Sequence, residues 1–124
     1  MKFESIENII VWQKARTLGV QTHAIIENVK DAELKRKLWK ETITIMNTIA
    51  EWYEKPTKKD LIDSLYTAKW YCGKYRSMLH MVMELGFIDN TTHQNLMNAS
   101  LDVTKLLAGF IKKLKEVKPW TEAA

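Results

Sequence analysis

The sequence predicts an all-α protein that folds as one antiparallel, up-down-up-down four-helix bundle. Three observations favour this class. The 124 residues include only four glycines and two prolines, which leaves little turn chemistry. Apolar residues recur every three or four positions over long stretches, and no series of short alternating β-branched segments occurs. We therefore expect a single domain over residues 1–118.

The first helix is expected at about residues 8–28, where Trp12, Leu18 and Ile25 recur at helical spacing. A second helix is expected at about residues 31–54. Asp31 is its expected N-cap, and its apolar stripe ends at Trp52 or Tyr53.

The third helix is expected at about residues 58–85. Pro56 ends the preceding helix, and the Thr57 to Asp60 segment resembles a capping box that starts the next one. The apolar stripe of this helix includes Cys72. Gly86 supplies the left-handed residue that commonly closes a helix.

The fourth helix is expected at about residues 92–116, with residues 91–94, Thr-Thr-His-Gln, as its capping box. Short links between long helices favour antiparallel neighbours, hence the bundle. Residues 119–124 are expected to form a frayed carboxyl-terminal tail.

The composition restricts the class of protein. A lone cysteine cannot form an intramolecular disulfide, and no secretory signal pattern opens the chain, so we expect a cytoplasmic protein. No apolar run approaches the roughly 18 residues of a membrane span. The net charge of +4 permits an anionic partner without requiring one.

The second and third helices carry more large apolar residues than one core can cover. The excess indicates an interface between copies of the chain, because aromatic and Met side chains are enriched at interface cores. Partial cover by neighbouring helices is the plainer alternative. The expected interface residues are Trp39, Trp52, Tyr66, Trp70, Tyr71, Met78 and Met81.

Basic residues gather on the second and fourth helices, and lysines outnumber arginines sixteen to three. Lysines suit phosphate contact more than base readout, so these residues form a candidate nucleic-acid surface, multiplied by oligomer symmetry. The alternative is a solvated face that keeps the protein soluble. The candidate residues are Lys35, Arg36, Lys37, Lys40, Lys105, Lys112, Lys113 and Lys115.

The sequence shows few features of a catalytic or metal-binding site. His23, His80 and His93 lack the cysteine or aspartate spacing of zinc sites, and no glycine-rich phosphate loop occurs. Cys72 lies on an apolar stripe and is expected to be a small buried hydrophobe. We expect no enzymatic activity, cofactor or metal.

Several segments resemble one family. Residues 6–16, IENIIVWQKAR, look like the "L-x-V-W-Q-K-A-R" opening of the bacterial four-helix-bundle proteins encoded in 23S rRNA intervening sequences. Residues 44–51, 68–79 and 84–88 are similar to that family's "S-I-x-N-N-I-A-E-G", "A-x-G-S-C-G-E-x-R-S-M-L" and "E-L-G-Y-I" stretches. The resemblance covers about residues 3–116.

The resemblance implies a four-helix bundle that assembles as a homopentameric, ring-like barrel without established enzymatic activity. A distant branch is the accessory variability determinant of diversity-generating retroelements, a basic barrel that binds reverse transcriptase and nucleic acid. The chain departs from the family pattern where Trp52, Trp70 and Tyr71 replace small residues and Lys74 replaces a glutamate. Trp39 and Lys40 also stand where the family has a basic pair.

Two functions follow as hypotheses. The first is a non-enzymatic oligomeric scaffold that binds a nucleic-acid or protein partner through its basic surface. The second is a purely structural, self-assembling bundle whose lysines serve solubility. An enzyme or metal carrier is a third and weaker alternative.

Overall fold

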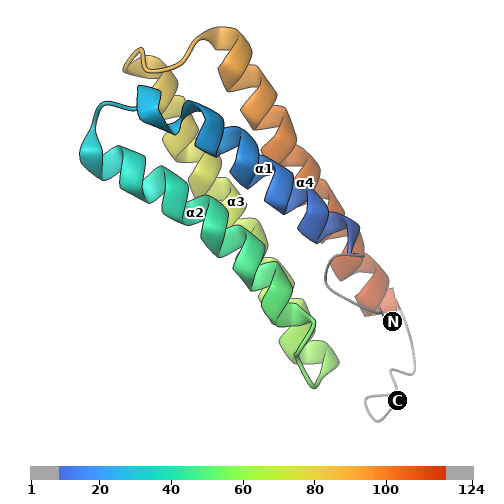
Figure 1. The fold of residues 1–124 in the computed structure, drawn as a ribbon. Helices are drawn as coiled ribbons and strands as arrows, with labels where there is room; N and C mark the ends of the chain where they lie inside the picture. Colours follow the sequence, from blue (N-terminus) through green and yellow to red (C-terminus); the bar gives the residue numbers. More distant parts are fainter. Residues whose placement is uncertain (1–8, 117–124) are drawn as a thin grey trace.

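The structure is a computed structural model that describes residues 9–116. It contains α1 (Ile10–Ile25), the short 3-10 helix η2 (Ile26–Asn28), α2 (Ala32–Trp52), α3 (Lys58–Glu84) and α4 (Asn90–Glu116), shown in Figure 1. No strand occurs in this part of the chain, which confirms the all-α class with four α-helices. The expected frayed tail, residues 119–124, lies outside the described residues.

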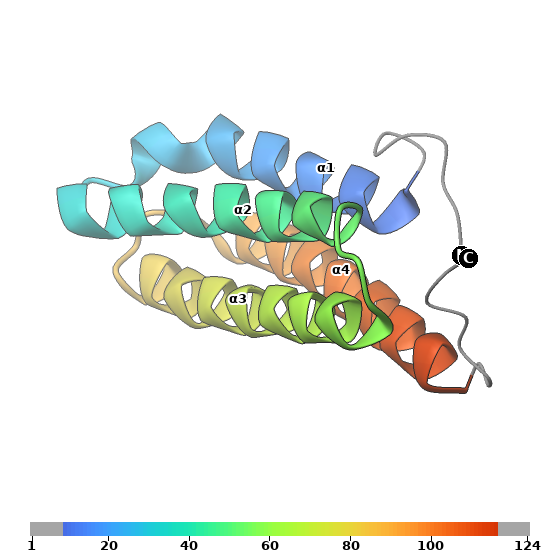
Figure 2. The same ribbon diagram turned by 90° about the horizontal axis from the view of Figure 1, so that it is seen from below.

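The helices alternate in direction and form two layers, with α1 beside α2 in one and α3 beside α4 in the other (Figure 2). The extensive contacts join α1 to α2, α2 to α3, α3 to α4 and α4 to α1. The pairs α1/α3 and α2/α4 are therefore the diagonals of the bundle.

Side-chain caps start three of the helices. The Oδ1 atom of Asp31 accepts a hydrogen bond from the Leu34 amide at 2.9 Å, and Oγ1 of Thr57 accepts one from the Asp60 amide at 3.1 Å. Both expected caps are confirmed. Each side-chain oxygen satisfies an amide that has no partner within the helix.

The capping box expected at residues 91–94 is wrong. Asp89 caps α4 instead, because its Oδ1 accepts a hydrogen bond from the Thr92 amide at 2.8 Å and its carbonyl accepts one from His93 at 3.0 Å. The helix thus starts two residues earlier than expected. The hydrogen bond from the Thr92 amide lowers the pKa of the Asp89 carboxyl, since it stabilises the charged form.

Gly86 closes α3 in the left-handed conformation, with φ of 81°. The Gly86 amide donates to the Met83 carbonyl at 2.9 Å, and the Phe87 amide donates to the Val82 carbonyl at 3.1 Å. This pair of bonds is a Schellman motif, so the expected role of Gly86 is confirmed.

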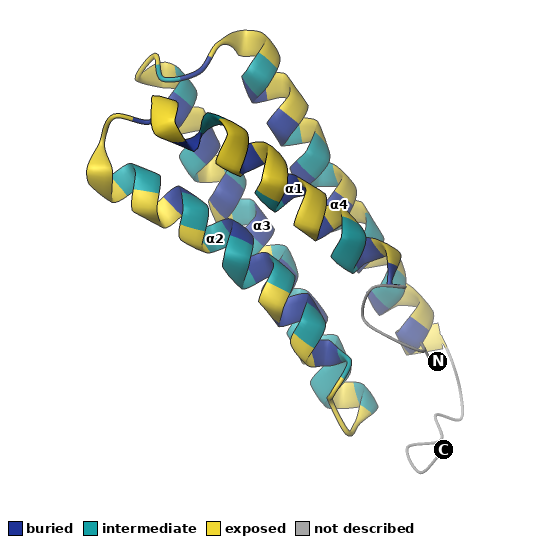
Figure 3. Cartoon of the chain, in the orientation of Figure 1, coloured by how far each residue is buried: buried dark blue, intermediate teal, exposed yellow. Residues whose placement is uncertain are grey.

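The core runs the length of the bundle and takes buried residues from all four α-helices. In Figure 3 these buried residues recur at intervals along each helix, while exposed residues line the outer face of α1. The Tyr75 hydroxyl lies 2.7 Å from Oγ1 of Thr22, across the α1/α3 diagonal. Cys72 is buried in the same core, as the sequence predicts.

Trp52 is a core residue, and its assignment to a subunit interface is wrong. It is only 5% exposed, and its ring meets that of Phe110 edge to face, with centroids 5.0 Å apart. The reason is positional: Trp52 continues the inward stripe of α2 after Ile45 and Ile49. The two aromatic rings close the core across the α2/α4 diagonal.

Candidate nucleic-acid interface

The last three turns of α4 carry four exposed lysines: Lys105, Lys112, Lys113 and Lys115. The inward positions of these turns are Leu107, Ile111 and Leu114, which are buried, so the lysines between them face outward. Lys113 and Lys115 also lie in the last turn, where the negative end of the helix dipole favours cations.

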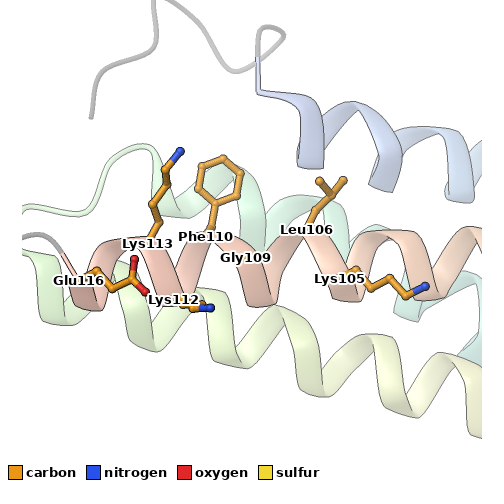
Figure 4. Close-up of a pocket in the computed structure, with 7 residues that line it drawn as sticks. All are labelled: Lys105, Leu106, Gly109, Phe110, Lys112, Lys113 and Glu116. Atoms are coloured by element: carbon orange, nitrogen blue, oxygen red, sulfur yellow. The ribbon is translucent and has the colours of Figure 1, made fainter.

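Two shallow hollows flank the outer ridge of α4. The first has a volume of about 490 Å³, and its lining residues are Lys105, Leu106, Gly109, Phe110, Lys112, Lys113 and Glu116. Figure 4 shows the side chains of Leu106, Phe110 and Lys113 extending toward the side on which α1 lies. This hollow therefore combines an apolar floor with a lysine rim.

The second hollow lies between α3 and α4. Its lining residues are Tyr66, Lys69, Ala108, Ile111, Lys112, Lys115 and Glu116. The Nζ atom of Lys115 donates a hydrogen bond to the Tyr66 hydroxyl at 2.8 Å and lies 5.0 Å from the centroid of its ring. Lys69 Nζ lies 6.0 Å from the same centroid. Tyr66 thus holds two lysines close together.

The residues around both hollows form the α4 lysine patch, defined as Lys69, Lys105, Lys112, Lys113 and Lys115. Glu116 is the one carboxylate among the lining residues. Within residues 9–116 none of these five lysines forms an ion pair. The positive charge of the patch is therefore left largely uncompensated by the bundle.

The expected basic residues of α2 have a different environment. Lys35 pairs with Glu27 at 3.0 Å, while Arg36 and Lys37 share Glu33 at 2.8 and 3.6 Å. The hydrogen bond from Lys35 lowers the pKa of Glu27, and that from Arg36 lowers the pKa of Glu33. These carboxylates offset much of the local positive charge. Lys40 is exposed one turn farther along.

The structure does not bring the two expected basic sets together within one chain. The residues of α2 lie near its start, at one end of the bundle, whereas Lys112, Lys113 and Lys115 lie in the last turns of α4, at the other end (Figure 1). Lys105 lies near the middle of α4. The two helices are also diagonal to each other. The single basic rim expected from both helices is therefore two separate surfaces.

The expected interface residues fall into three groups. Trp70 is 66% exposed and Met81 53% exposed on the outer face of α3, and Leu85, which no sequence pattern singled out, is 53% exposed directly after it. The half-buried residues that pack against the core are Trp39, Tyr66, Tyr71 and Met78. Trp52 is buried, as described above. Three of the five exposed large apolar side chains in the described part of the chain thus lie on α3 or directly after it, and the other two, Ile10 and Val20, lie on α1.

Metal-ligating side chains do not cluster in the part of the chain that the structure describes. Among residues 9–116, no group of three or more His, Cys, Asp or Glu side chains could hold a metal ion. Burial raises the pKa of the Cys72 thiol to about 11, which keeps it protonated and unreactive at neutral pH. In the same range, no helix has the length and apolar character needed to cross a membrane.

Two comparisons place this bundle among known proteins. The sequence model of the family described as 23S rRNA-intervening sequence protein matches residues 7–109. A similar solved structure is a protein of unknown function from the S23 ribosomal protein family of Bacteroides thetaiotaomicron, with a TM-score of 0.76 and 18% identity over 82% of this chain and 98% of that one. At this identity the likeness shows the fold alone. No curated protein matches the chain.

Proposed function

The chain belongs to the 23S rRNA-intervening sequence protein family, and we propose that it is a non-enzymatic oligomeric scaffold that binds nucleic acid through the α4 lysine patch. One observation supports this proposal above the others. The five lysines of the patch cluster without ion-pair partners in the described chain, whereas Lys35, Arg36 and Lys37 on α2 are paired.

An uncompensated lysine cluster attracts phosphates, because binding releases the counterions condensed on a nucleic acid. Lysine supplies a point charge and reads little sequence, so the expected affinity depends on salt more than on sequence. The name of the family links it to ribosomal RNA, which favours RNA as the partner. The distant resemblance to the retroelement accessory protein points to the same kind of partner, either nucleic acid or an enzyme that acts on it.

The oligomer is the second part of the proposal. Trp70, Met81 and Leu85 are separated by eleven and four residues, so they share the outer face of α3. Apolar side chains on one face are typical of contact sites. We expect a neighbouring copy to cover this face in the ring of five that the family resemblance implies. Such a ring would repeat the lysine patch around its axis.

Two matched variants test the binding surface. The first replaces the four lysines of α4 (K105Q, K112Q, K113Q, K115Q), and the second replaces the four basic residues of α2 (K35Q, R36Q, K37Q, K40Q). Each removes four positive charges. In fluorescence anisotropy with a labelled single-stranded RNA at low salt, the α4 variant should bind at least about tenfold more weakly, since each lost phosphate contact lowers the affinity.

The α2 variant should stay within about threefold of the wild type, because carboxylates already offset three of its four basic residues. Equal losses in the two variants would refute the assignment to α4. A wild type that assembles but does not bind RNA would instead favour the purely structural bundle, which the exposed apolar face of α3 supports.

A further inference from the structure

Arg76 lies at the seam between α3 and α4 and is held by neutral partners. Its Nη1 atom donates hydrogen bonds to Oγ1 of Thr104 at 2.7 Å and to Oγ of Ser100 at 3.1 Å. No carboxylate pairs with it within residues 9–116. The guanidinium is half-buried and carries five N–H donors, so donors on Nε and Nη2 remain for an anion.

The same seam contains part of the α4 lysine patch. On α3, Tyr66 contacts Lys115 of α4 and Arg76 contacts Thr104 of α4. These two contacts define the antiparallel register of the two helices. Lys69 precedes Arg76 by seven residues, which is two helical turns, so both lie on the same side of α3. Arg76 therefore continues the line of cations that Lys115, Lys112 and Lys69 begin.

Small residues keep this line open. A side chain placed at Gly73 would meet nothing within 4 Å, and Ala108 is exposed on the α4 side. The space next to Gly73, which lies between Lys69 and Arg76 on α3, is therefore open to that distance. An extended anionic chain can follow the seam from one end of the line to the other.

We propose that one strand of nucleic acid lies in the α3/α4 seam, with its phosphates on Lys115, Lys112 and Lys69 and a further phosphate of the same strand bound by the guanidinium of Arg76. This proposal rests on the proposed function. It adds the path of the strand, the length of strand that the seam holds and the role of Arg76 as a phosphate-binding residue. The planar fork of arginine can bind two phosphate oxygens at once, which a lysine cannot do.

The geometry favours a single strand over a duplex. Packed helices are about 8–10 Å apart, so their seam is narrower than a duplex, and Arg76 is recessed between them. The eleven residues from Thr104 to Lys115 span about 17 Å of helix. With about 3.4 Å per stacked nucleotide, the seam takes about five nucleotides.

The test measures binding of labelled oligouridylates of three, six and nine nucleotides by wild type, Arg76→Gln, Arg76→Lys and the control Arg36→Gln. The control removes an arginine of α2 that pairs with Glu33 and lies outside the α3/α4 seam. Thermal unfolding confirms that each variant is folded. Arg76→Lys keeps the charge in case the glutamine variant does not fold.

We expect Arg76→Gln to bind the six-nucleotide RNA about tenfold more weakly than wild type. The slope of log K against log salt concentration should also become about 0.7 shallower, as the loss of one phosphate contact predicts. Arg76→Lys should keep the same slope and bind the six-nucleotide RNA about threefold more weakly, because lysine retains the charge but lacks the planar guanidinium. The trinucleotide, which reaches only the lysine end, should bind wild type and Arg76→Gln equally. Arg36→Gln should match wild type.

The outcomes separate the two proposals. If Arg76→Gln binds the six-nucleotide RNA like wild type while the four-lysine α4 variant loses binding, the seam path is wrong and the lysine patch stands. If a blunt duplex binds as tightly as the single strand and shows the same dependence on Arg76, the strand assignment is wrong. If the wild type binds no RNA, the proposed function itself fails.

Discussion

The hydroxyl of Tyr75 donates its hydrogen bond to Oγ1 of Thr22 in the buried core. The two oxygens lie 2.7 Å apart, and the Thr22 hydroxyl gives its own proton to the Leu18 carbonyl at 2.8 Å. Since Thr22 has one proton to donate, Tyr75 must be the donor of the shared bond. This bond joins α1 to α3, helices that are diagonal to each other in the bundle.

Replacing Tyr75 with phenylalanine should lower the free energy of unfolding by about 1 kcal/mol, the usual value of a buried neutral hydrogen bond. The volume of the ring is kept, so packing changes little. Urea unfolding of Tyr75→Phe, Thr22→Val and the double variant gives the coupling between the two residues. Strictly additive losses would mean that the pair does not interact.

The stability of the protein should fall in alkaline solution. Burial raises the pKa of Tyr75 to about 12 and that of Cys72 to about 11, from ordinary values near 10 and 9. The unfolded chain loses these protons at a lower pH than the folded protein does. The free energy of unfolding therefore keeps its full value below about pH 9 and decreases as the pH rises through about 12.

Unfolding by urea at a series of pH values between about 8 and 11 measures this decrease, which the linkage relation ties to proton release. The double variant Tyr75→Phe and Cys72→Ala lacks both groups and should give a flatter profile than wild type. An equally steep profile in the variant would assign the alkaline loss to other groups.

Two glycines should respond to alanine in opposite ways. Gly86→Ala should lower the free energy of unfolding by about 1–2 kcal/mol, because the φ of 81° at residue 86 places a Cβ against the following carbonyl. Gly109→Ala should gain about 0.5–1 kcal/mol, since the residue lies within α4 and a Cβ there meets nothing within 4 Å. Thermal unfolding of both variants measures the contrast, and a loss of stability in both would contradict it.

Trp52 and Trp70 should differ as core and surface residues do. Trp52→Ala should lower the free energy of unfolding by about 3–5 kcal/mol, because it opens a cavity beside Phe110. Replacing the exposed Trp70 and Met81 with serine should instead reduce the mass found by light scattering, with little effect on the unfolding of the subunit. An unchanged mass would refute the proposed interface on α3.

The helices could be predicted from the sequence because their signals are local. Periodicity gave the stripes, and Asp31, Thr57 and Gly86 act on backbone atoms within four residues of themselves. The start of α4 was misplaced because Asp89 and Thr91 both suit a cap. Pattern alone could not show which of the two the chain uses.

The site depends on contacts between distant segments and was only partly predictable. Lys69 and Arg76 meet α4 through the register of the α3/α4 hairpin, which no motif in either helix indicates. The short link that begins at Gly86 indicates this register, since it fixes which residues of α3 lie opposite which residues of α4. The pairing of Arg36 with Glu33 was also readable, because the two are three residues apart on one helix.

The salt dependence of RNA binding by the wild-type protein tests directly whether the α4 lysine patch holds phosphates. The five lysines of the α4 patch and Arg76 predict a linear decrease of log K with log salt concentration and a slope of about −4.2 for a single strand. The four-lysine α4 variant, which keeps Lys69 and Arg76, should have a slope of about −1.4 or no measurable binding. A wild-type affinity that does not change with salt, or a slope that the α4 variant retains, would contradict the account.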